Sequence, residues 1–385
     1  MEEALRLYEN HLRGRARRER VPLMCTFELT PTCNLRCRFC YVALDPYKGP
    51  YLSTEQVFSI LDKLERAGVL YLTLTGGEVL SRRDFREIYL YAKRKGFLVT
   101  LFSNATMVTE RISSLLAEHP PFCVEVSIYG ADAEHYEKVT QIPGSFGRFV
   151  RGIELLQRAG VKLVLKTPVS TMIEDHLPEM VEFARIRGLL PLKYDPVLDA
   201  RHDGGQEPVV YRIGVRRVGA LHEQMDALNR DFLKFLPDKS GEHSLPLTPR
   251  APLAECADVA GSSEEELYRC GAGRTALFVD ALGNAAHCII DREPSFSLLE
   301  LEWEEVWARM GEWVTQPLPK DAPCSGCGLR SSCSNCPARS KLATGSPYLK
   351  DTYRCDLTHL EHGLEPESHP DYRALSRRPL GACAV

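Results

Sequence analysis

The stretch CNLRCRFCY, residues 33–41, places Cys33, Cys37 and Cys40 in a C-x3-C-x2-C spacing. Structural zinc sites normally use four ligands in paired spacings, and this run supplies three. Three thiolates on one loop can instead hold three corners of a four-iron cluster and leave the fourth iron open to another ligand. The spacing therefore indicates a [4Fe-4S] cluster with one open iron.

The composition is that of an ordinary globular chain of 385 residues, 44% hydrophobic and 26% charged, with a net charge of -4. A chain of this length can bury a large core, and we expect one large domain and a smaller one. The charge gives no indication of nucleic acid, and no apolar run predicts a signal peptide or a membrane span. We therefore expect a cytoplasmic protein with neither nucleic acid nor membrane as a partner. In that reducing compartment the fourteen cysteines are metal ligands or catalytic thiols rather than disulfides.

Six short apolar runs alternate with amphipathic stretches, several of which end at a glycine such as Gly68, Gly96 or Gly160. Alternating strands and helices predict a parallel α/β sheet with helices outside it, either doubly wound or an incomplete barrel. The predicted strands are Cys25–Thr30, Val69–Thr75, Phe97–Ser103, Cys123–Tyr129, Val161–Thr167 and Leu190–Val197.

Polar residues follow these strands where each one ends. The carboxyl ends of parallel strands meet at one edge of the sheet, which is where α/β proteins bind ligands. We therefore expect the loops to converge on one pocket with the cysteine run. The residues concerned are Gly76, Gly77, Glu78, Ser103, Asn104, Tyr129, Lys166 and Asp195.

With these residues in place, CNLRCRFC resembles the cluster motif of the radical S-adenosylmethionine (SAM) enzymes. The resemblance covers Met24 to Val197 and implies a partial (β/α)6 TIM-type barrel. It implies that the open iron chelates SAM, and that reductive cleavage gives a 5'-deoxyadenosyl radical that abstracts hydrogen from a substrate. It also implies cofactor-binding roles for Phe39 near adenine, Gly76, Gly77 and Glu78 at the methionine amino group, Asn104 and Ser127 near the ribose, and Lys166.

A second group of cysteines lies beyond a proline-rich stretch, and it includes the run CSGCGLRSSCSNC. This group resembles the SPASM extension of peptide-modifying radical enzymes, which holds two auxiliary clusters. The resemblance assigns Cys270, Cys288 and Cys336 to the first cluster, and Cys324, Cys327, Cys333 and Cys355 to the second.

Cys256 is a possible further ligand of the first auxiliary cluster, which otherwise is open or takes a ligand other than cysteine. Paired C-x2-C spacings also suit zinc, so a non-enzymatic zinc module is the alternative for this group. The cluster motif earlier in the chain favours iron and sulfur, and it predicts [4Fe-4S] clusters in three places: one that binds SAM and two auxiliary.

The sequence divides into five predicted parts. We expect an N-terminal helical arm over 1–22, the barrel over 23–200, a linker over 201–255, the SPASM domain over 256–360 and a tail over 361–385. The basic run RGRARRER within the arm favours a solvated helix face or a mobile arm over a docking site for an acidic partner.

The resemblance to SPASM enzymes implies a precursor peptide as substrate, modified by a thioether or carbon-carbon crosslink. An enzyme acting on a small or porphyrin-like molecule, or a sulfatase-type maturase, are the alternatives. Sulfatase-type enzymes carry an Asp directly after the cysteine that matches Cys288; Ile289 stands here, and Asp291 comes two residues later. Asp195 and Asp291 are the candidate catalytic carboxylates. As further partners we expect a flavodoxin- or ferredoxin-type electron donor and a separate leader-binding protein.

Overall fold

The computed structural model describes residues 2–42, 51–233, 266–330, 332–333 and 336–365, with side chains from residue 11 onward. Its strands form one sheet of nine, in the order β6-β5-β4-β3-β2-β1-β7-β8-β9. The strands are β1 (Met24–Thr30), β2 (Tyr71–Gly76), β3 (Leu98–Ser103), β4 (Cys123–Ser127), β5 (Leu163–Pro168), β6 (Lys193–Asp195), β7 (Ala276–Val279), β8 (Asn284–Ala286) and β9 (Ser295–Ser297).

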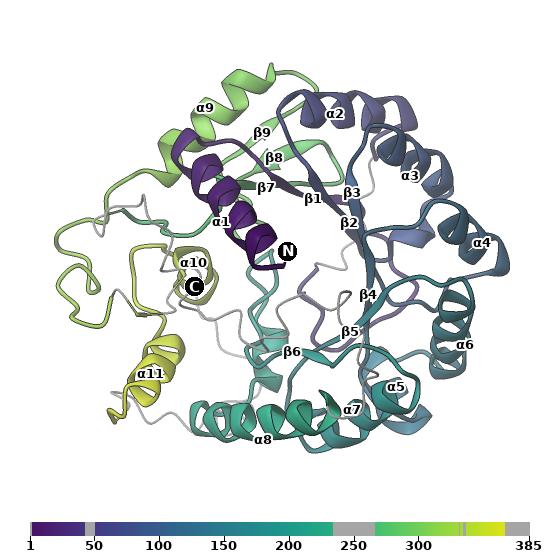
Figure 1. Ribbon diagram of the computed structural model, residues 1–385. Helices are drawn as coiled ribbons and strands as arrows, with labels where there is room; N and C mark the ends of the chain where they lie inside the picture. The colour runs from purple at the N-terminus through teal and green to yellow at the C-terminus, as the bar shows by residue number, and fades with distance from the viewer. Residues whose placement is uncertain (1, 43–50, 234–265, 331, 334–335, 366–385) are drawn as a thin grey trace, which may run out of the picture.

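Strands β1 to β6 are all parallel to their neighbours, and helices surround them on the outside (Figure 1). The predicted partial barrel and its strands are thus confirmed, with ends shifted by a few residues. The outer helices are α2 (Thr54–Arg66), α3 (Phe85–Arg94), α4 (Glu110–Glu118), α5 (Ala133–Thr140), α6 (Ser145–Arg158), α7 (Leu177–Ile186) and α8 (Val215–Leu233), with short 3-10 turns η1 (Val79–Ser81), η2 (Glu174–His176) and η3 (Glu207–Tyr211).

Helix α2 illustrates why the sequence folds in this way. Ser53 forms a capping box with Gln56, so two backbone N–H groups that the helix leaves without partners are satisfied. Val57, Ile60, Leu61 and Leu64 form the buried stripe of the helix. The chain then reverses at Gly68, whose φ of +94° suits a residue without a Cβ.

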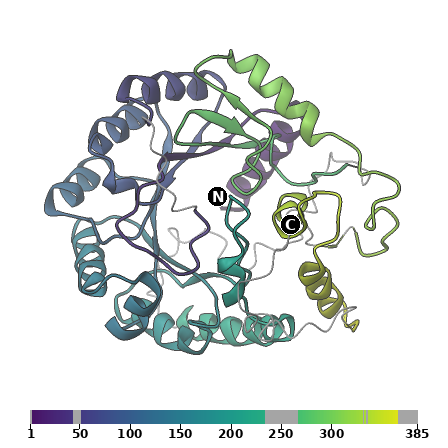
Figure 2. The ribbon, with the colours of Figure 1, turned by 180° about the vertical axis from the view of Figure 1, so that it is seen from behind.

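The C-terminal segment extends the barrel sheet instead of forming a separate body. Strand β7 pairs in parallel with β1, and β8 and β9 follow it as antiparallel strands. A short turn over residues 280–283 joins β7 to β8. Helices α9 (Trp303–Val314), α10 (Pro337–Thr344) and α11 (Thr352–Glu361) complete the segment. Seen from behind, α10 and α11 lie across the ring from α3 and α4 (Figure 2).

The stretch predicted as a linker, 201–255, is not extended throughout. It contains η3 and the 19-residue helix α8, which packs beside α7 and α11. Leu221 and Met225 of α8 are fully buried, and this apolar face explains the helix. Residues 234–255 lie outside the described part of the chain.

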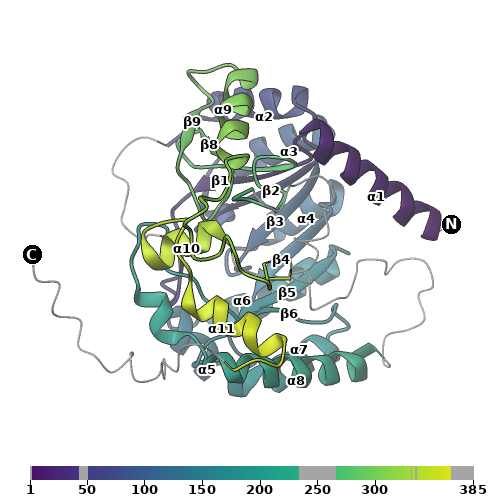
Figure 3. The ribbon, with the colours of Figure 1, turned by 90° about the vertical axis from the view of Figure 1, so that its left-hand side faces the viewer.

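Helix α1 (Glu2–Glu19) projects from one side of the molecule, with the N-terminus at its far end (Figure 3). Its C-terminal end is fixed by two arginines of the basic run. Arg17 donates to the Arg269 carbonyl at 2.7 Å, and Arg20 donates to the carbonyls of Gly273 and Trp307. These two residues of the run therefore anchor the helix on the C-terminal segment, where we expected a solvated face or a mobile arm.

The described helices include none that is both long and apolar enough to cross a membrane.

Candidate functional site

The cysteine loop begins where β1 ends and crosses the carboxyl edge of the sheet. Two backbone bonds fasten it to the end of helix α5: Arg36 N donates to the Thr140 carbonyl at 3.0 Å, and Arg38 N donates to the Val139 carbonyl at 3.1 Å. A third bond, from Cys40 N to the Cys37 carbonyl, closes a tight turn between two of the thiols. The protein backbone itself thus sets the positions of the three cysteines.

The three thiols are partly buried on one loop, and this setting suits a metal cluster. Burial raises the pKa of the Cys33 thiol to about 11 and raises the pKa values of Cys37 and Cys40 as well. Neutral thiols are poor ligands, so a strongly positive centre is needed to hold all three as thiolates. Cys33, Cys37 and Cys40 are therefore a donor set that fits a cluster and leaves its fourth position free.

Gly76 and Gly77 lie directly against the start of the cysteine loop. A Cβ on Gly76 would meet the Thr30 carbonyl oxygen at 2.2 Å, and one on Gly77 would meet the carbonyl oxygens of Pro31 and Thr32 at 2.5 Å. The Gly77 and Glu78 N–H groups donate to Thr30 and Thr32. Packing inside the protein is thus sufficient reason for both glycines, and their contact with a cofactor stays a prediction.

Glu78 is 1% exposed and has partners within the protein. Its carboxylate accepts hydrogen bonds from Leu80 N at 3.1 Å, the Ser103 hydroxyl at 2.8 Å and Asn104 N at 2.7 Å. Burial raises the pKa of Glu78, although these hydrogen bonds oppose the shift. Glu78 ties the loop after β2 to the loop after β3. Its predicted contact with the methionine ammonium stays a prediction.

Phe39 is 4% exposed and packs edge-on against Tyr129 and Tyr211, with ring centroids 5.8 and 6.2 Å away. Burial raises the pKa of the Tyr129 hydroxyl, and the nearby Cys37 and Cys40 add to the shift. Ser127 ends β4 and is partly buried, and its predicted contact with a ribose stays a prediction. Tyr129 was named at the sequence level only as part of the loop after the fourth strand.

Lys166 lies on the inner face of the sheet, two residues before the end of β5. Its ammonium is 3.3 Å from the Glu125 carboxylate and lies against the Phe102 ring. Lys193 of β6 is 2.8 Å from the same carboxylate. Burial lowers the pKa of Lys166 to about 8, although the Glu125 charge opposes the shift. Two ammonium groups share one carboxylate here, which leaves a local excess of positive charge at β5 and β6.

A second ion pair on the inner face links the barrel to the C-terminal segment. Arg292 donates to Glu28 of β1 at 2.8 Å, and its guanidinium lies 4.4 Å from the centre of the Phe278 ring in β7. Sequence analysis missed this pair. Strand alternation could have found Glu28, since it is a polar residue inside an apolar strand and so faces inward.

The two predicted catalytic carboxylates lie in different settings. Asp195, at the end of β6, accepts a hydrogen bond from Val197 N at 3.0 Å, and the Arg339 guanidinium is 3.9 Å away. Asp291 is 3% exposed and accepts hydrogen bonds from the Tyr268 hydroxyl and the Lys341 ammonium, both at 2.7 Å. The Asp291 carboxylate therefore stabilises the C-terminal segment. A catalytic role for either residue stays a prediction.

Asp199 and two arginines of the C-terminal helices form a further buried network that the sequence did not reveal. The Asp199 carboxylate is 3.1 Å from both Arg339 of α10 and Arg354 of α11. Arg354 is 2% exposed. These ion pairs attach α10 and α11 to the loop that follows β6.

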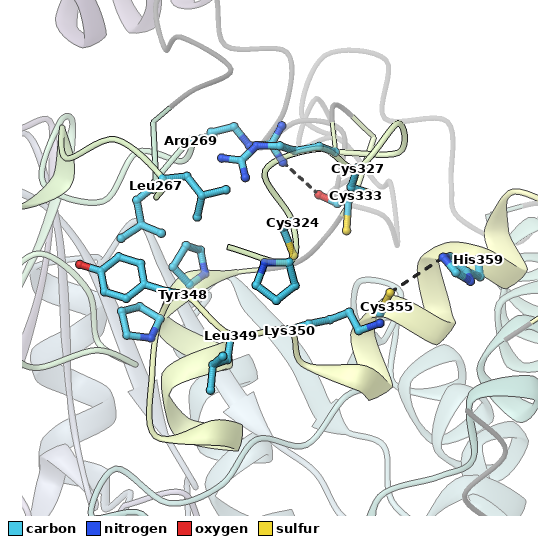
Figure 4. Close-up of a pocket in the computed structure, with 15 residues that line it drawn as sticks. Leu267, Arg269, Cys324, Cys327, Cys333, Tyr348, Leu349, Lys350, Cys355 and His359 are labelled. Atoms are coloured by element: carbon cyan, nitrogen blue, oxygen red, sulfur yellow. Dashed lines mark hydrogen bonds between the residues drawn. The ribbon is translucent and has the colours of Figure 1, made fainter. Parts of the chain in front are cut away.

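Four cysteines of the predicted second auxiliary cluster line one pocket (Figure 4). Cys324, Cys327 and Cys333 come from the turns before α10, and Cys355 comes from α11. Basic side chains share the lining, and the His359 ring is 3.9 Å from the Cys355 sulfur. These basic residues are Arg269, Arg330, Lys350 and His359.

Two cysteines of the predicted first auxiliary cluster lie beside a small apolar core. Cys288 and Cys336 both pack against the core of Leu267, Tyr268, Val314 and Ala338. Burial raises the pKa of Cys288 to about 11, and the nearby Cys336 adds to the shift. Cys270 precedes β7 and is partly buried. Cys256 lies outside the described residues.

Within the described part of the chain, no three His, Cys, Asp or Glu side chains come close enough together to hold a single metal ion.

Comparison with known proteins identifies proteins that are similar to this chain. The sequence profile of the Radical SAM superfamily matches residues 27–184, which contain the cysteine loop and strands up to β5. These residues form a Radical SAM domain. The chain is an enzyme, and the domain implies that it uses SAM and a [4Fe-4S] cluster.

Two relatives match over most of both chains. The AdoMet-dependent heme synthase of Oleidesulfovibrio alaskensis is 25% identical over 84% of this chain and 84% of its own. The mycofactocin maturase MftC of Mycobacterium tuberculosis is 28% identical over 90% of this chain and 86% of its own. Among solved structures, Streptococcus suis SuiB bound to the precursor peptide SuiA has a TM-score of 0.68 at 16% identity, covering 92% of this chain and 81% of that chain. This likeness confirms the predicted fold.

Proposed function

We propose that this radical SAM enzyme oxidatively modifies a ribosomally made precursor peptide by a thioether or carbon-carbon crosslink. The observation that carries the proposal is the 28% identity with a peptide maturase over 90% of the chain. The cysteine-rich region that follows the barrel in sequence adds support. Crosslinking removes more electrons from the substrate than SAM cleavage alone accounts for, so a further electron acceptor is needed. The substrate would enter the barrel from its carboxyl edge.

In this proposal Cys33, Cys37 and Cys40 hold the cluster that binds SAM. When bound, SAM and the cluster supply a radical that can abstract a hydrogen atom from an unactivated carbon. The chain contributes position and exclusion of water. Glu78 and the two glycines hold the loops of the site together, and Phe39 with its aromatic neighbours closes the wall beside Cys37.

We assign the two auxiliary clusters to the C-terminal cysteines. The shared pocket of Cys324, Cys327, Cys333 and Cys355 supports the second site, and the closeness of Cys288 to Cys336 supports the first. Cys270 would complete the first site with Cys256 or another ligand. Strands β7 to β9 lie in the barrel sheet, so the auxiliary domain that we propose over 256–360 shares its sheet with the barrel domain over 23–200.

Two kinds of partner follow from this chemistry. A flavodoxin- or ferredoxin-type protein would supply the electron for SAM cleavage, and a separate leader-binding protein would present the peptide. Both are part of the proposal.

The test uses anaerobically reconstituted enzyme, SAM, a reductant and a candidate short precursor peptide. Mass spectrometry should find peptide that has lost two hydrogens, formed together with 5'-deoxyadenosine. The control is the Cys33→Ala, Cys37→Ala, Cys40→Ala variant, which should form neither. An unchanged peptide mass with continued deoxyadenosine formation would contradict crosslinking.

A small-molecule substrate is the second candidate, since the heme synthase relative is 25% identical over 84% of both chains. The local excess of positive charge at β5 and β6 suits the carboxylates of a porphyrin-like substrate. The two candidates separate in one experiment, in which a porphyrin and the peptide are offered together. Consumption of the porphyrin with the peptide intact would favour the second candidate.

A further inference from the structure

The Asn104 side chain lies between the cysteine loop and the turn after β3. Its Oδ1 atom accepts hydrogen bonds from the backbone N–H of Thr106 at 2.9 Å and from the Thr106 hydroxyl at 2.6 Å. Its Nδ2 atom donates to Asn34 Oδ1 at 3.0 Å and to the Cys33 sulfur at 3.8 Å. Every polar atom of this side chain therefore has a partner within the protein.

The orientation of the amide follows from these partners. A backbone N–H can only donate, so the atom of Asn104 that faces Thr106 N must be the oxygen. The Thr106 hydroxyl accepts from Asn34 Nδ2 at 2.7 Å and so donates its own proton to Asn104. Asn34, Thr106 and Asn104 form a closed ring of hydrogen bonds, which directs the amide N–H of Asn104 at Cys33.

The backbone of Asn104 is fixed as well. Its N–H donates to the buried Glu78 carboxylate at 2.7 Å, and the residue is 8% exposed. The next residue, Ala105, has a φ of +60°. Gly152 of α6 packs closely on Ala105, so that a Cβ on Gly152 would lie 2.1 Å from the Ala105 carbonyl oxygen. The side chain therefore cannot swing toward a ligand without breaking several contacts, in contrast to the ribose contact that we expected from the sequence.

We propose that Asn104 is a positioning residue that donates a hydrogen bond to the Cys33 thiolate and so raises the reduction potential of the cluster held there. Leu35 N supplies a second donor to the same sulfur, at 3.4 Å. Donors near a cluster sulfur stabilise the more negative, reduced state, so each one raises the potential. The inference rests on the proposed role of Cys33 as a cluster ligand.

The test compares reduction potentials by anaerobic redox titration, following the electron paramagnetic resonance signal that changes when SAM is added. Asn104→Asp keeps an acceptor for Thr106 but loses the donor and places negative charge beside the thiolate. We expect the reduction equilibrium of that cluster to shift at least tenfold toward the oxidised form, which for one electron is about 59 mV. Asn104→Ala should shift it in the same direction by less.

Two variants of the ring serve as matched controls. Thr106→Ser keeps the hydroxyl and should keep the wild-type potential, whereas Thr106→Val loses it and should lower the potential slightly. Iron content and circular dichroism identify variants that still hold the cluster. Wild-type potentials in all cluster-holding variants would overturn the proposal, and so would loss of iron from all four variants, because that outcome indicates a purely structural role. If the wild-type protein itself lacks a SAM-responsive cluster, the proposed function fails instead.

Discussion

The barrel loop and the C-terminal segment both present groups of cysteines, but the protein holds the two groups by different means. The barrel loop is fixed by β1, by the glycines packed under it and by the hydrogen bonds of Glu78 and Asn104. In the C-terminal segment, successive turns such as Cys327 N to the Cys324 carbonyl at 3.4 Å position the thiols. The apolar core beside the first auxiliary set has four buried residues.

This difference indicates which of the two regions depends on metal binding for its folding. A site that the surrounding protein already holds in place needs little from its metal, whereas a small cysteine-rich region gains much of its stability from the metal itself. We therefore expect the barrel to keep its fold without its cluster and the C-terminal turns to depend on theirs. Substitutions in either region should therefore have different consequences.

The largest effect should come from replacing Cys33, Cys37 and Cys40 together by alanine. In the proposed function these thiols hold the cluster that binds SAM, so 5'-deoxyadenosine formation should fall below detection. Circular dichroism should show an intact barrel, and the iron of the C-terminal segment should remain. Chromatography of the reaction mixture measures the nucleoside, and its persistence in this variant would refute the assignment of the site.

Cys327→Ala tests the C-terminal region while leaving the barrel loop unchanged. Cys327 is exposed at the rim of the auxiliary pocket, and its loss should leave SAM cleavage running while the yield of crosslinked peptide falls about tenfold or more. The physical reason is that a substrate radical needs an electron acceptor before it can close a bond. The matched control is Cys123→Ala, which removes a cysteine from the inner wall of the barrel instead. Normal crosslinking by folded Cys327→Ala protein that lacks the second cluster would exclude the acceptor role.

Two glycines in helix α6 test how tightly the barrel site is packed. A Cβ on Gly152 would lie 2.1 Å from the Ala105 carbonyl oxygen, whereas one on Gly147 would meet nothing within 4 Å. Gly152→Ala should lower the free energy of unfolding by about 2 kcal/mol. Gly147→Ala should raise it by about 0.5–1 kcal/mol, because alanine favours helix.

Denaturant titrations of the two glycine variants, followed by circular dichroism, supply this measurement. Equal stabilities would show that the turn after β3 yields freely, contrary to the preformed site described above.

The smallest predicted effect concerns the charge on the inner face of the barrel. Burial lowers the pKa of Lys166 to about 8, so this amine should become reactive toward acetic anhydride around pH 8. The folded chain should accordingly gain stability as the pH rises from about 8 toward about 10.4, the ordinary lysine value. Glu125→Gln removes the charge that opposes the shift and should move the labelling midpoint to lower pH. Mass spectrometry of labelled peptides gives the midpoint, and a midpoint near pH 10.4 in both proteins would contradict the buried setting.

Strand periodicity and glycine placement were sufficient to predict a parallel α/β sheet with helices outside it, because both are local signals, whereas the partial barrel was implied by the family resemblance. The cysteine spacing likewise singled out the loop that crosses the carboxyl edge of the sheet. The parallel pairing of β7 with β1 could not be predicted, since it joins segments about 250 residues apart in sequence. Helix α8 was missed because the polar Asn229 interrupts its buried stripe of Val218, Leu221, Met225 and Phe232, and because the residues between them are mostly polar.

The individual site residues show a second limit of sequence reasoning. Glu78 and Asn104 were found by their position after strands, yet the roles predicted for them were toward a ligand. In the structure their partners are Ser103, Thr106 and Cys33. Such partners come from different loops, and only the folded sheet brings them together. The pairing of Arg292 with Glu28 was not predicted for the same reason, because the two residues are 264 positions apart in sequence.

The contrast between the two regions is tested most directly by counting iron and sulfide in the anaerobically purified wild-type protein and in the Cys33→Ala, Cys37→Ala, Cys40→Ala variant. One barrel cluster and two auxiliary clusters predict about twelve irons per wild-type chain and about eight in the variant, with sulfide in equal amounts. About four irons in the wild-type chain, or the loss of all iron from the variant, would contradict the account of two regions that bind their clusters independently.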